Sequence, residues 1–182
     1  LNGLTYSPTV NYYGADTLNV STNDLGNTGV GGPLTTAGSV GITVAYTAPS
    51  VTPSGGSASY TEGNAPVAVD PGLTLSAGTL GNLTGATVQI SANYANGQDV
   101  LAFTNQLGIT GSWNAATGTL TLTGTTSVAN YQTALRSITY QDSSANPSTL
   151  NRTVTFSVND GLTTQSAARQ VSVAAVNDPP VD

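Results

Sequence analysis

Residues 153–160 read TVTFSVND, and this stretch decides the fold. Apolar side chains occupy positions 154, 156 and 158, and hydroxyl side chains occupy 153, 155 and 157. Alternation with a period of two places all the apolar groups on one face of a β-strand. The Asn-Asp pair that follows is typical of a turn. The stretch therefore predicts a half-buried strand that ends in a hairpin.

A second copy of this strand stands near the start of the chain, where residues 17–24 read TLNVSTND. Residues 42–44 (ITV) match 171–173 (VSV), and residues 1–6 (LNGLTY) match 135–140 (LRSITY). Self-similarity at this spacing indicates an array of repeated modules. Residues 1–47 are predicted to be the back end of one repeat, and residues from about 58 to 175 a whole one.

The rest of the chain also has β-type patterning. Residues 86–92, 101–103, 118–123 and 170–174 alternate in the same way, and NAATG at 114–118 reads as a hairpin turn. Residues 127–135 instead carry apolar groups at helical spacing behind Ser127, which predicts one short capped helix. About seven strands and one helical turn over 58–175 predict an all-β protein with a β-sandwich fold.

Four segments follow from this pattern. We expect residues 1–47 to be the C-terminal half of a β-sandwich repeat, with about four strands and no complete core. Residues 48–59 (APSVTPSGGSAS) read as an uncharged linker rich in Pro, Gly and Ser. Residues 60–175 form the complete sandwich, and residues 176–182 an exit linker.

Composition excludes several kinds of partner. The 182 residues include three Arg, no Lys and nine acids, for a net charge of -6. Nucleic acid and anionic membranes need a basic face that this chain lacks. No apolar run approaches the roughly 20 residues of a membrane span. Without Cys there is no disulfide. No signal peptide is visible, so we expect an excised piece of a longer secreted chain.

Catalysis is also disfavoured. The chain has neither His nor Cys, which removes the commonest general base and the best nucleophile. A pair of carboxylates could hydrolyse glycosides, but the nine acids are scattered, mostly over predicted turns. We therefore expect no enzyme.

Three motifs together resemble a known family: YTEG at 60–63, VNDG at 158–161 and VNDPPV at 176–181. With GQDVL at 97–101 and YQTALRSITY at 131–140, the chain resembles the cadherin-like repeats of giant bacterial surface and biofilm adhesins. The resemblance implies a Greek-key sandwich like those of cadherins and immunoglobulins. It also implies a tandem arrangement on the cell exterior, with Ca²⁺ bound at domain junctions.

The resemblance also implies metal ligands. Glu62 would supply a carboxylate at the first strand, and Asn177 and Asp178 would supply oxygens from the exit linker. Asp160 is a further candidate, although Asp160-Gly161 equally fits a type I′ turn. Hard oxygen donors converging at a junction suit Ca²⁺ as the cofactor. The sequence departs from the family at residues 77–80 (AGTL) and at 48–59, where the expected acids are missing.

These observations predict a non-enzymatic stalk repeat of a large secreted or surface-bound bacterial protein, stiffened by calcium at its junctions. Its partners would be neighbouring repeats or like chains, with an unknown glycan or surface ligand. The alternative is a subunit of an extracellular filament, in which strands from another chain complete the first sandwich.

Three smaller questions stay open at the level of sequence. Thr119, Thr121 and Thr123 could bind a glycan or an ice surface if they lie exposed in register. The tyrosines read either as core or as a sugar-stacking platform. Arg136 and Arg152 lie one on each side of Asp142 in the sequence, where a surface ion pair would contribute about 0–1 kcal/mol.

Overall fold

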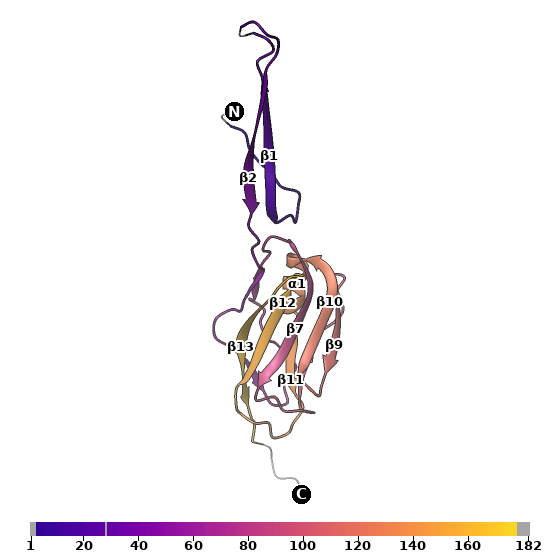
Figure 1. The fold of residues 1–182 in the computed structure, drawn as a ribbon. Coiled ribbons are helices and arrows are strands. Elements are labelled where there is room, and N and C mark those ends of the chain that lie inside the picture. Colours follow the sequence, from indigo (N-terminus) through magenta and orange to yellow (C-terminus); the bar gives the residue numbers. More distant parts are fainter. Residues whose placement is uncertain (1–2, 28, 178–182) are drawn as a thin grey trace. The chain divides into compact units, whose positions relative to one another are not determined.

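The structure is a computed structural model that describes residues 3–27 and 29–177. The chain divides into two compact units, Leu1–Thr47 and Ala48–Asp182 (Figure 1). Each unit is described below by itself.

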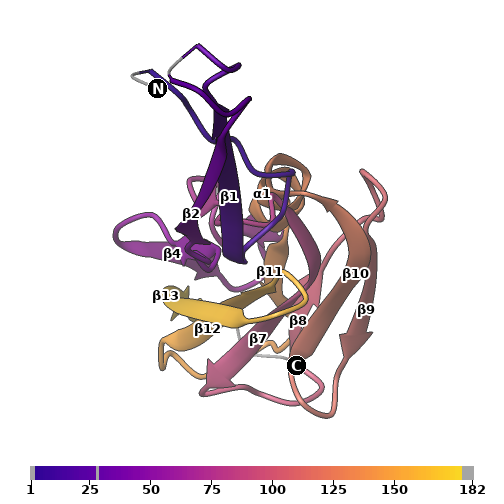
Figure 2. The same cartoon turned by 45° about the horizontal axis from the view of Figure 1, so that its top comes forward.

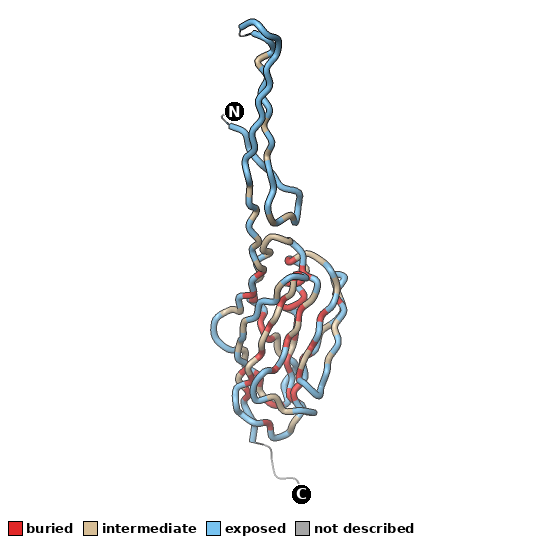
Figure 3. Tube along the Cα trace, in the orientation of Figure 1, coloured by how far each residue is buried: buried red, intermediate tan, exposed pale blue. Residues whose placement is uncertain are grey.

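The described part of the first unit contains two strands rather than the expected four. Strand β1 (Gly14–Asn23) pairs antiparallel with β2 (Thr35–Val44), in a register that sets Asp16 opposite Ile42. Its residues are exposed or only partly buried, and none is in the buried class (Figure 3). A two-stranded hairpin has no second layer against which to bury a face.

The loop between β1 and β2 is held by its Asn-Asp pair. Asn23 Oδ1 accepts the Leu25 N–H at 2.6 Å, and Asn23 Nδ2 donates to Thr35 Oγ1 at 2.9 Å. Asp24 Oδ1 accepts the backbone N–H groups of Gly26 and Leu34 at 2.9 and 2.8 Å. Short polar side chains thus satisfy donors that the turn leaves unpaired.

The second unit is a β-sandwich, as the sequence predicts (Figure 2). Its larger sheet has the order β4-β13-β12-β7-β10-β9, and smaller sheets have the orders β5-β11-β8 and β3-β6. The larger sheet contains β4 (Ser57–Thr61), β7 (Asn82–Ala92), β9 (Thr110–Asn114), β10 (Thr119–Ser127), β12 (Arg152–Asn159) and β13 (Thr164–Ala174). The smaller sheets contain β5 (Val67–Ala68), β8 (Asp99–Ala102), β11 (Thr139–Asp142), β3 (Ser50–Thr52) and β6 (Thr74–Ser76).

The core lies between these sheets and follows the alternation read from the sequence. Val154, Phe156 and Val158 of β12 are all fully buried. Helix α1 (Val128–Arg136) closes one end, and the Ser127 hydroxyl caps it by accepting the Asn130 N–H at 3.2 Å. The other large, fully buried apolar side chains are Leu73, Leu83, Leu101, Ile109, Leu122, Leu135, Ile138, Tyr60, Tyr131 and Tyr140.

The hairpins β1–β2 and β12–β13 are equivalent residue by residue. Arg152 lies opposite Val171, just as Asp16, at the matching position, lies opposite Ile42. The loop bonds are repeated as well: Asn159 Oδ1 accepts the Gly161 N–H at 2.7 Å, and Asn159 Nδ2 donates to Thr164 Oγ1 at 2.7 Å. The sequence repeat is therefore a structural repeat, and the two copies differ mainly in loop length.

The stretch predicted as a linker, residues 48–59, contains ordered strands of the second unit. Strand β3 pairs with β6, and β4 adds to the large sheet by parallel pairing with β13. Val51 is buried in the core cluster although Pro and Gly residues follow it. The prediction of a linker was wrong here. Composition indicates that a segment contains turn residues, but it does not indicate whether the backbone of that segment pairs with a strand elsewhere in the chain.

Candidate functional site

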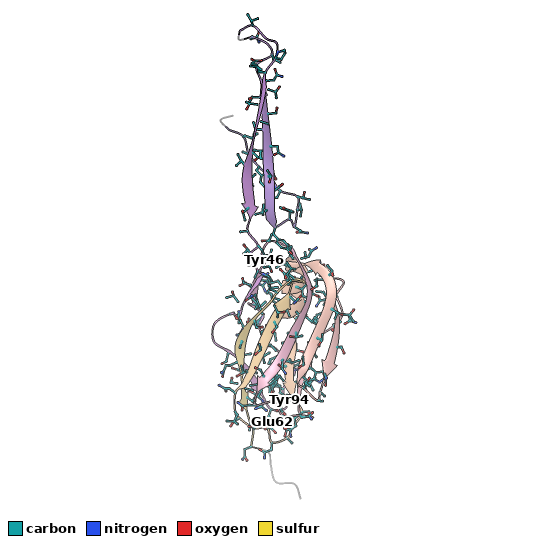
Figure 4. The ribbon with its side chains drawn as sticks, viewed as in Figure 1. Tyr46, Glu62 and Tyr94 are labelled. Atoms are coloured by element: carbon teal, nitrogen blue, oxygen red, sulfur yellow. The ribbon has the colours of Figure 1, made fainter. Side chains whose placement is uncertain are left out.

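Of the metal ligands predicted from the sequence, Glu62 is buried and held by hydrogen bonds. It follows β4 directly, and its backbone N–H donates to the Ala174 carbonyl at 2.9 Å. Its Oε2 accepts the Val176 N–H at 2.8 Å, so the carboxylate fastens the start of the exit segment (Figure 4). Glu62 is only 8% exposed, and its Oε1 is buried without a hydrogen-bond partner. A buried carboxylate oxygen with no partner is costly, which marks it for a further donor or a cation.

A hollow of about 480 Å³ adjoins Glu62 at this end of the unit. The Tyr60 hydroxyl donates to the Asp142 carbonyl at 2.7 Å and joins the two sides of the hollow. The remaining lining comes from short polar or small residues, namely Gly63, Gln141, Ser143, Ser144, Ala145 and Val176. The lining thus includes two acids: Glu62, which has one carboxylate oxygen without a partner, and Asp142, whose carboxylate is paired with Arg152.

A buried ionic cluster borders the hollow. Arg152 Nη2 lies 2.9 Å from Asp142 Oδ2, and Arg152 Nε lies 3.2 Å from both oxygens of Asp99. Arg152 Nη1 donates to the carbonyls of Ser148 and Leu150 at 2.6 and 2.7 Å. The side chains of Arg152, Asp99 and Asp142 have no solvent exposure. One guanidinium thus balances two carboxylates in a dry environment.

Burial controls the titration of this cluster. Desolvation raises the pKa of Asp142 above its usual value, and the nearby Asp99 adds to this rise. The Ser144 N–H and Arg152 oppose it. Desolvation also raises the pKa of Tyr140, whose hydroxyl donates to Asp99 Oδ1. Burial therefore disfavours the charged form of Asp142 relative to an exposed carboxyl group.

The expectation of a surface pair beside Asp142 was wrong, because its partner Arg152 is buried with it and Arg136 donates to the Leu73 carbonyl instead. The sequence contained a signal for this burial. Arg152 shares the parity of Val154, Phe156 and Val158 along β12, which places it on the inward face. Asp142 has the parity of Tyr140, and Asp99 that of Leu101. Period-two alternation, applied to charged as well as apolar residues, would have placed all three inside.

Of the other predicted ligands, Asp160 lies far from Glu62. Strand β12 runs from Arg152, beside the cluster, to Asn159, so Asp160 lies at the far end of a strand roughly 25 Å long. There Asp160 Oδ1 accepts the N–H groups of Leu162 and Thr163, both at 3.0 Å. Asn177 is exposed and follows the Val176 that Glu62 holds. Asp178 lies outside the described residues.

A metal ion bound at Glu62 would need further ligands from outside the described residues. Within residues 3–27 and 29–177, no group of three or more acidic side chains is arranged to hold an ion. The orphaned Glu62 Oε1 nevertheless fits a hard cation, with Asn177 close along the chain. The donors present therefore fit calcium as one side of a shared site, because calcium takes six to eight oxygens.

The aromatic residues pack mainly into the core. Tyr60 and Tyr140 meet edge to face, with ring centroids 5.4 Å apart. The buried Tyr131 hydroxyl donates to the Gly124 carbonyl at 2.6 Å. The partly buried Trp113 meets Tyr94 edge to face with centroids 6.2 Å apart. These side chains are occupied with each other rather than arranged as an exposed platform.

The outward face of the large sheet is rich in hydroxyl groups. Thr121 and Thr123 are exposed and Thr119 is half-buried, all on the same side of β10. Thr121 lies opposite Thr87 on β7 and Ser112 on β9. The register that surface binding would require is therefore present.

The fold and the repeated hairpin together define the class, which is an all-β protein with a β-sandwich and a second copy of its C-terminal hairpin. No family model matches the chain. A similar protein is halomucin from Haloquadratum walsbyi, 36% identical over 121 residues. The match covers 63% of this chain and 1% of halomucin, so the chain spans about a hundredth of that relative. The likeness supports a large cell-surface repeat protein as the coarse class, and does not single out the cadherin-like adhesins.

The described residues also bear on membrane spanning by helices. Helix α1 is nine residues long, and no described helix has the length and apolarity to cross a bilayer.

Proposed function

We propose that this chain is a non-enzymatic structural module, a stalk repeat that spaces and extends a large bacterial or archaeal-type surface protein. The observation that carries the proposal is the recurrence of one hairpin, with the same pairing register and the same loop bonds, in both units. The likeness to a stretch of the much longer halomucin supports it. Function in such arrays lies in the string of modules rather than in one active site.

The distribution of polar groups supports a structural role. Inside the sandwich Arg152 donates to the carboxylates of Asp99 and Asp142 and to the Ser148 carbonyl. Arg169 and Asp70 form a second ion pair, in which Asp70 is buried and also accepts the Ser54 N–H at 2.9 Å. The strongest polar contacts thus serve to order the module.

Calcium at the Glu62 end is the finer part of the proposal. Glu62 Oε1, Asn177 and Asp178 would contribute oxygens, and a neighbouring module would supply the remainder. A bound ion would neutralise the orphaned oxygen and restrict the exit segment that Glu62 already holds. Extracellular modules bind calcium with dissociation constants of roughly 10⁻⁴–10⁻³ M, which suits adjustable stiffness better than a requirement for folding.

Thermal unfolding of the full chain in calcium and in chelator tests this part. About ten-fold excess over the dissociation constant should raise the free energy of unfolding by about 1.4 kcal/mol. The Glu62→Gln variant keeps an acceptor for the Val176 N–H and should lose the calcium response. Magnesium at the same concentration is the control for ionic strength. An equal response in wild type and variant would remove Glu62 from the site.

A second function has its own supporting observation. The first unit exposes apolar residues such as Val40, which is 55% exposed. Chains that complete each other's first unit would form a filament. Size-exclusion chromatography with light scattering separates the two functions. A monomer supports the stalk module, and polymers that grow with protein concentration would place the filament first.

A further inference from the structure

The β1–β2 hairpin has one face that carries its apolar residues together with a single acid, Asp16, opposite Ile42. The register sets Leu18 opposite Val40, with Ile42 and Val44 on the same side of β2 and Val20 on the same side of β1. The opposite side carries hydroxyl, amide and small side chains, among them Thr17, Asn19, Ser21, Ser39 and Thr43. Within the described residues, β1 and β2 pair only with each other. Both outer edges of this hairpin are therefore without a paired strand among the described residues.

The second unit shows what covers the equivalent face. Val154 and Val171, which match Leu18 and Ile42, are fully buried there. Strand β7 pairs with the outer edge of β12, and β4 pairs with the outer edge of β13. The layer opposite includes β11. The strands that cover the β12–β13 hairpin, namely β4, β7 and β11, all lie within residues 48–151, before the hairpin in the chain.

The residues that match β11 are already near the first hairpin. Leu4 and Tyr6 match Ile138 and Tyr140, and they line a hollow of about 230 Å³ with Leu18 and Ile42. Leu4 is 61% exposed and Tyr6 40%, whereas Ile138 and Tyr140 are fully buried. The first unit thus has the residues of the C-terminal half of a core, and a hollow where the N-terminal half of a repeat would pack.

The charge at one position is reversed between the units. Asp16 occupies the place of Arg152, and the Tyr6 hydroxyl donates to Asp16 Oδ2 at 2.7 Å. In the second unit the matching Tyr140 donates instead to Asp99 on β8. The hydrogen bond from Tyr6 lowers the pKa of Asp16, so Asp16 is an anion. In the first unit the carboxylate that accepts the tyrosine hydroxyl therefore lies on strand β1 of the hairpin, whereas in the second unit it lies on β8.

We propose that the β1–β2 hairpin is the docking surface for the front half of a repeat of this kind. A β7-like strand would pair with β1, a β4-like strand with β2, and the residue at the position of Asp99 would be non-acidic. An acid at that position would face Asp16 inside the completed core, where like charges are strongly unfavourable. The proposal rests on the repeat architecture of the proposed function but not on calcium.

A fusion chain tests the proposal directly. Residues 48–134 of this sequence are placed before Leu1 of the full chain, because Leu1 matches Leu135. Amide hydrogen exchange is then followed over residues 14–23 and 35–44. The chain's own β12–β13 hairpin serves as the internal reference, since it is already complete.

Three versions of the added segment separate the causes. With Asp99→Asn in the added copy, the hairpin amides should exchange at least about ten-fold more slowly than in the original chain. With Asp99 retained, protection should be smaller, because that carboxylate faces Asp16. With Val88→Asp and Ile90→Asp in the added β7, the hairpin should exchange as fast as it does in the original chain.

Each other outcome overturns the proposal. If the hairpin amides exchange equally fast in all chains, the added residues 48–134 do not dock on the hairpin, whether or not those residues are themselves folded. Equal protection by the disrupted β7 would show that covering is not by strand pairing. A dimer of the original chain with an already protected hairpin would assign the surface to a second copy. None of these results would touch the calcium response of Glu62.

Discussion

Arg152 Nη2 lies 2.9 Å from Asp142 Oδ2, and neither side chain is exposed to solvent. Asp99 completes the cluster through Arg152 Nε, and it also accepts the Ala95 N–H at 2.6 Å. The cluster joins β8, β11 and β12 across two sheets. Its contribution is therefore to fix the relation between the layers, beside the hollow that Glu62 adjoins.

Loss of the guanidinium should be severe. Arg152→Ala leaves two buried carboxylates without a counter-charge, and we expect the free energy of unfolding to fall by about 3–5 kcal/mol. Arg136→Ala is the matched control, because Arg136 is partly exposed and donates to the Leu73 carbonyl at 2.7 Å. That loss should be about 1 kcal/mol. Urea unfolding followed by Trp113 fluorescence measures both, and equal losses would contradict the assigned role of the cluster.

Acid should affect the wild type and Asp142→Asn differently. Burial raises the pKa of Asp142 in the folded state, so the native chain binds a proton that the unfolded chain has already lost. The Asp142 contribution to stability is therefore greatest below the unfolded pKa and falls as pH rises through the folded one. The unfolding free energy of wild type minus variant should therefore decline as pH rises above the ordinary carboxyl pKa of about 4. A difference that stays constant with pH would contradict this.

Gly124 should not tolerate a side chain. It lies at the register shift in β10 with φ +136°, and an added Cβ would come 2.2 Å from the Gly108 carbonyl oxygen. We expect Gly124→Ala to lower the free energy of unfolding by more than about 2 kcal/mol. Gly55→Ala is the control, since a Cβ there meets nothing within 4 Å. Calorimetry compares the two, and similar melting temperatures would show that the bulge relaxes.

Asp160 can be tested as a turn residue. Asp160→Ala removes the acceptor for the Leu162 and Thr163 N–H groups, and should cost about 1–3 kcal/mol. Asp160→Asn keeps an oxygen at that place and should retain most of the stability. Unfolding of both variants is measured in calcium and in chelator. A selective loss of the calcium response in Asp160→Asn would instead make Asp160 a ligand.

The sequence predicted those parts of the fold that local patterning determines. The strand at 153–158, the helix capped by Ser127 and the turn at 114–118 are present where alternation, capping and turn residues indicated them. The alignment of the two hairpins was also correct to the residue. The strand, the helix and the turn depend on neighbours within a few positions, and the hairpin alignment depends on the repeat in the sequence.

The parts that were missed depend on contacts distant in sequence. Strand β4 is a strand because β13, more than a hundred residues later, offers it an edge. Asp99, Asp142 and Arg152 become one cluster only when three strands from two sheets come together. The orphaned oxygen of Glu62 likewise has no local signature. Composition and periodicity carry no information on such pairings.

The parallel pairing of β4 with β13 has a consequence for a chain under tension. Five residue pairs join the two strands, from Ser57–Gln170 to Thr61–Ala174. A pull on the second unit through its two ends draws β4 backward from Ser57 and β13 forward from Ala174. The strands are then sheared along their length, and the hydrogen bonds between them resist together instead of opening one at a time. The order in which the chain enters and leaves this sandwich thus places β4 and β13 in shear when the chain is stretched.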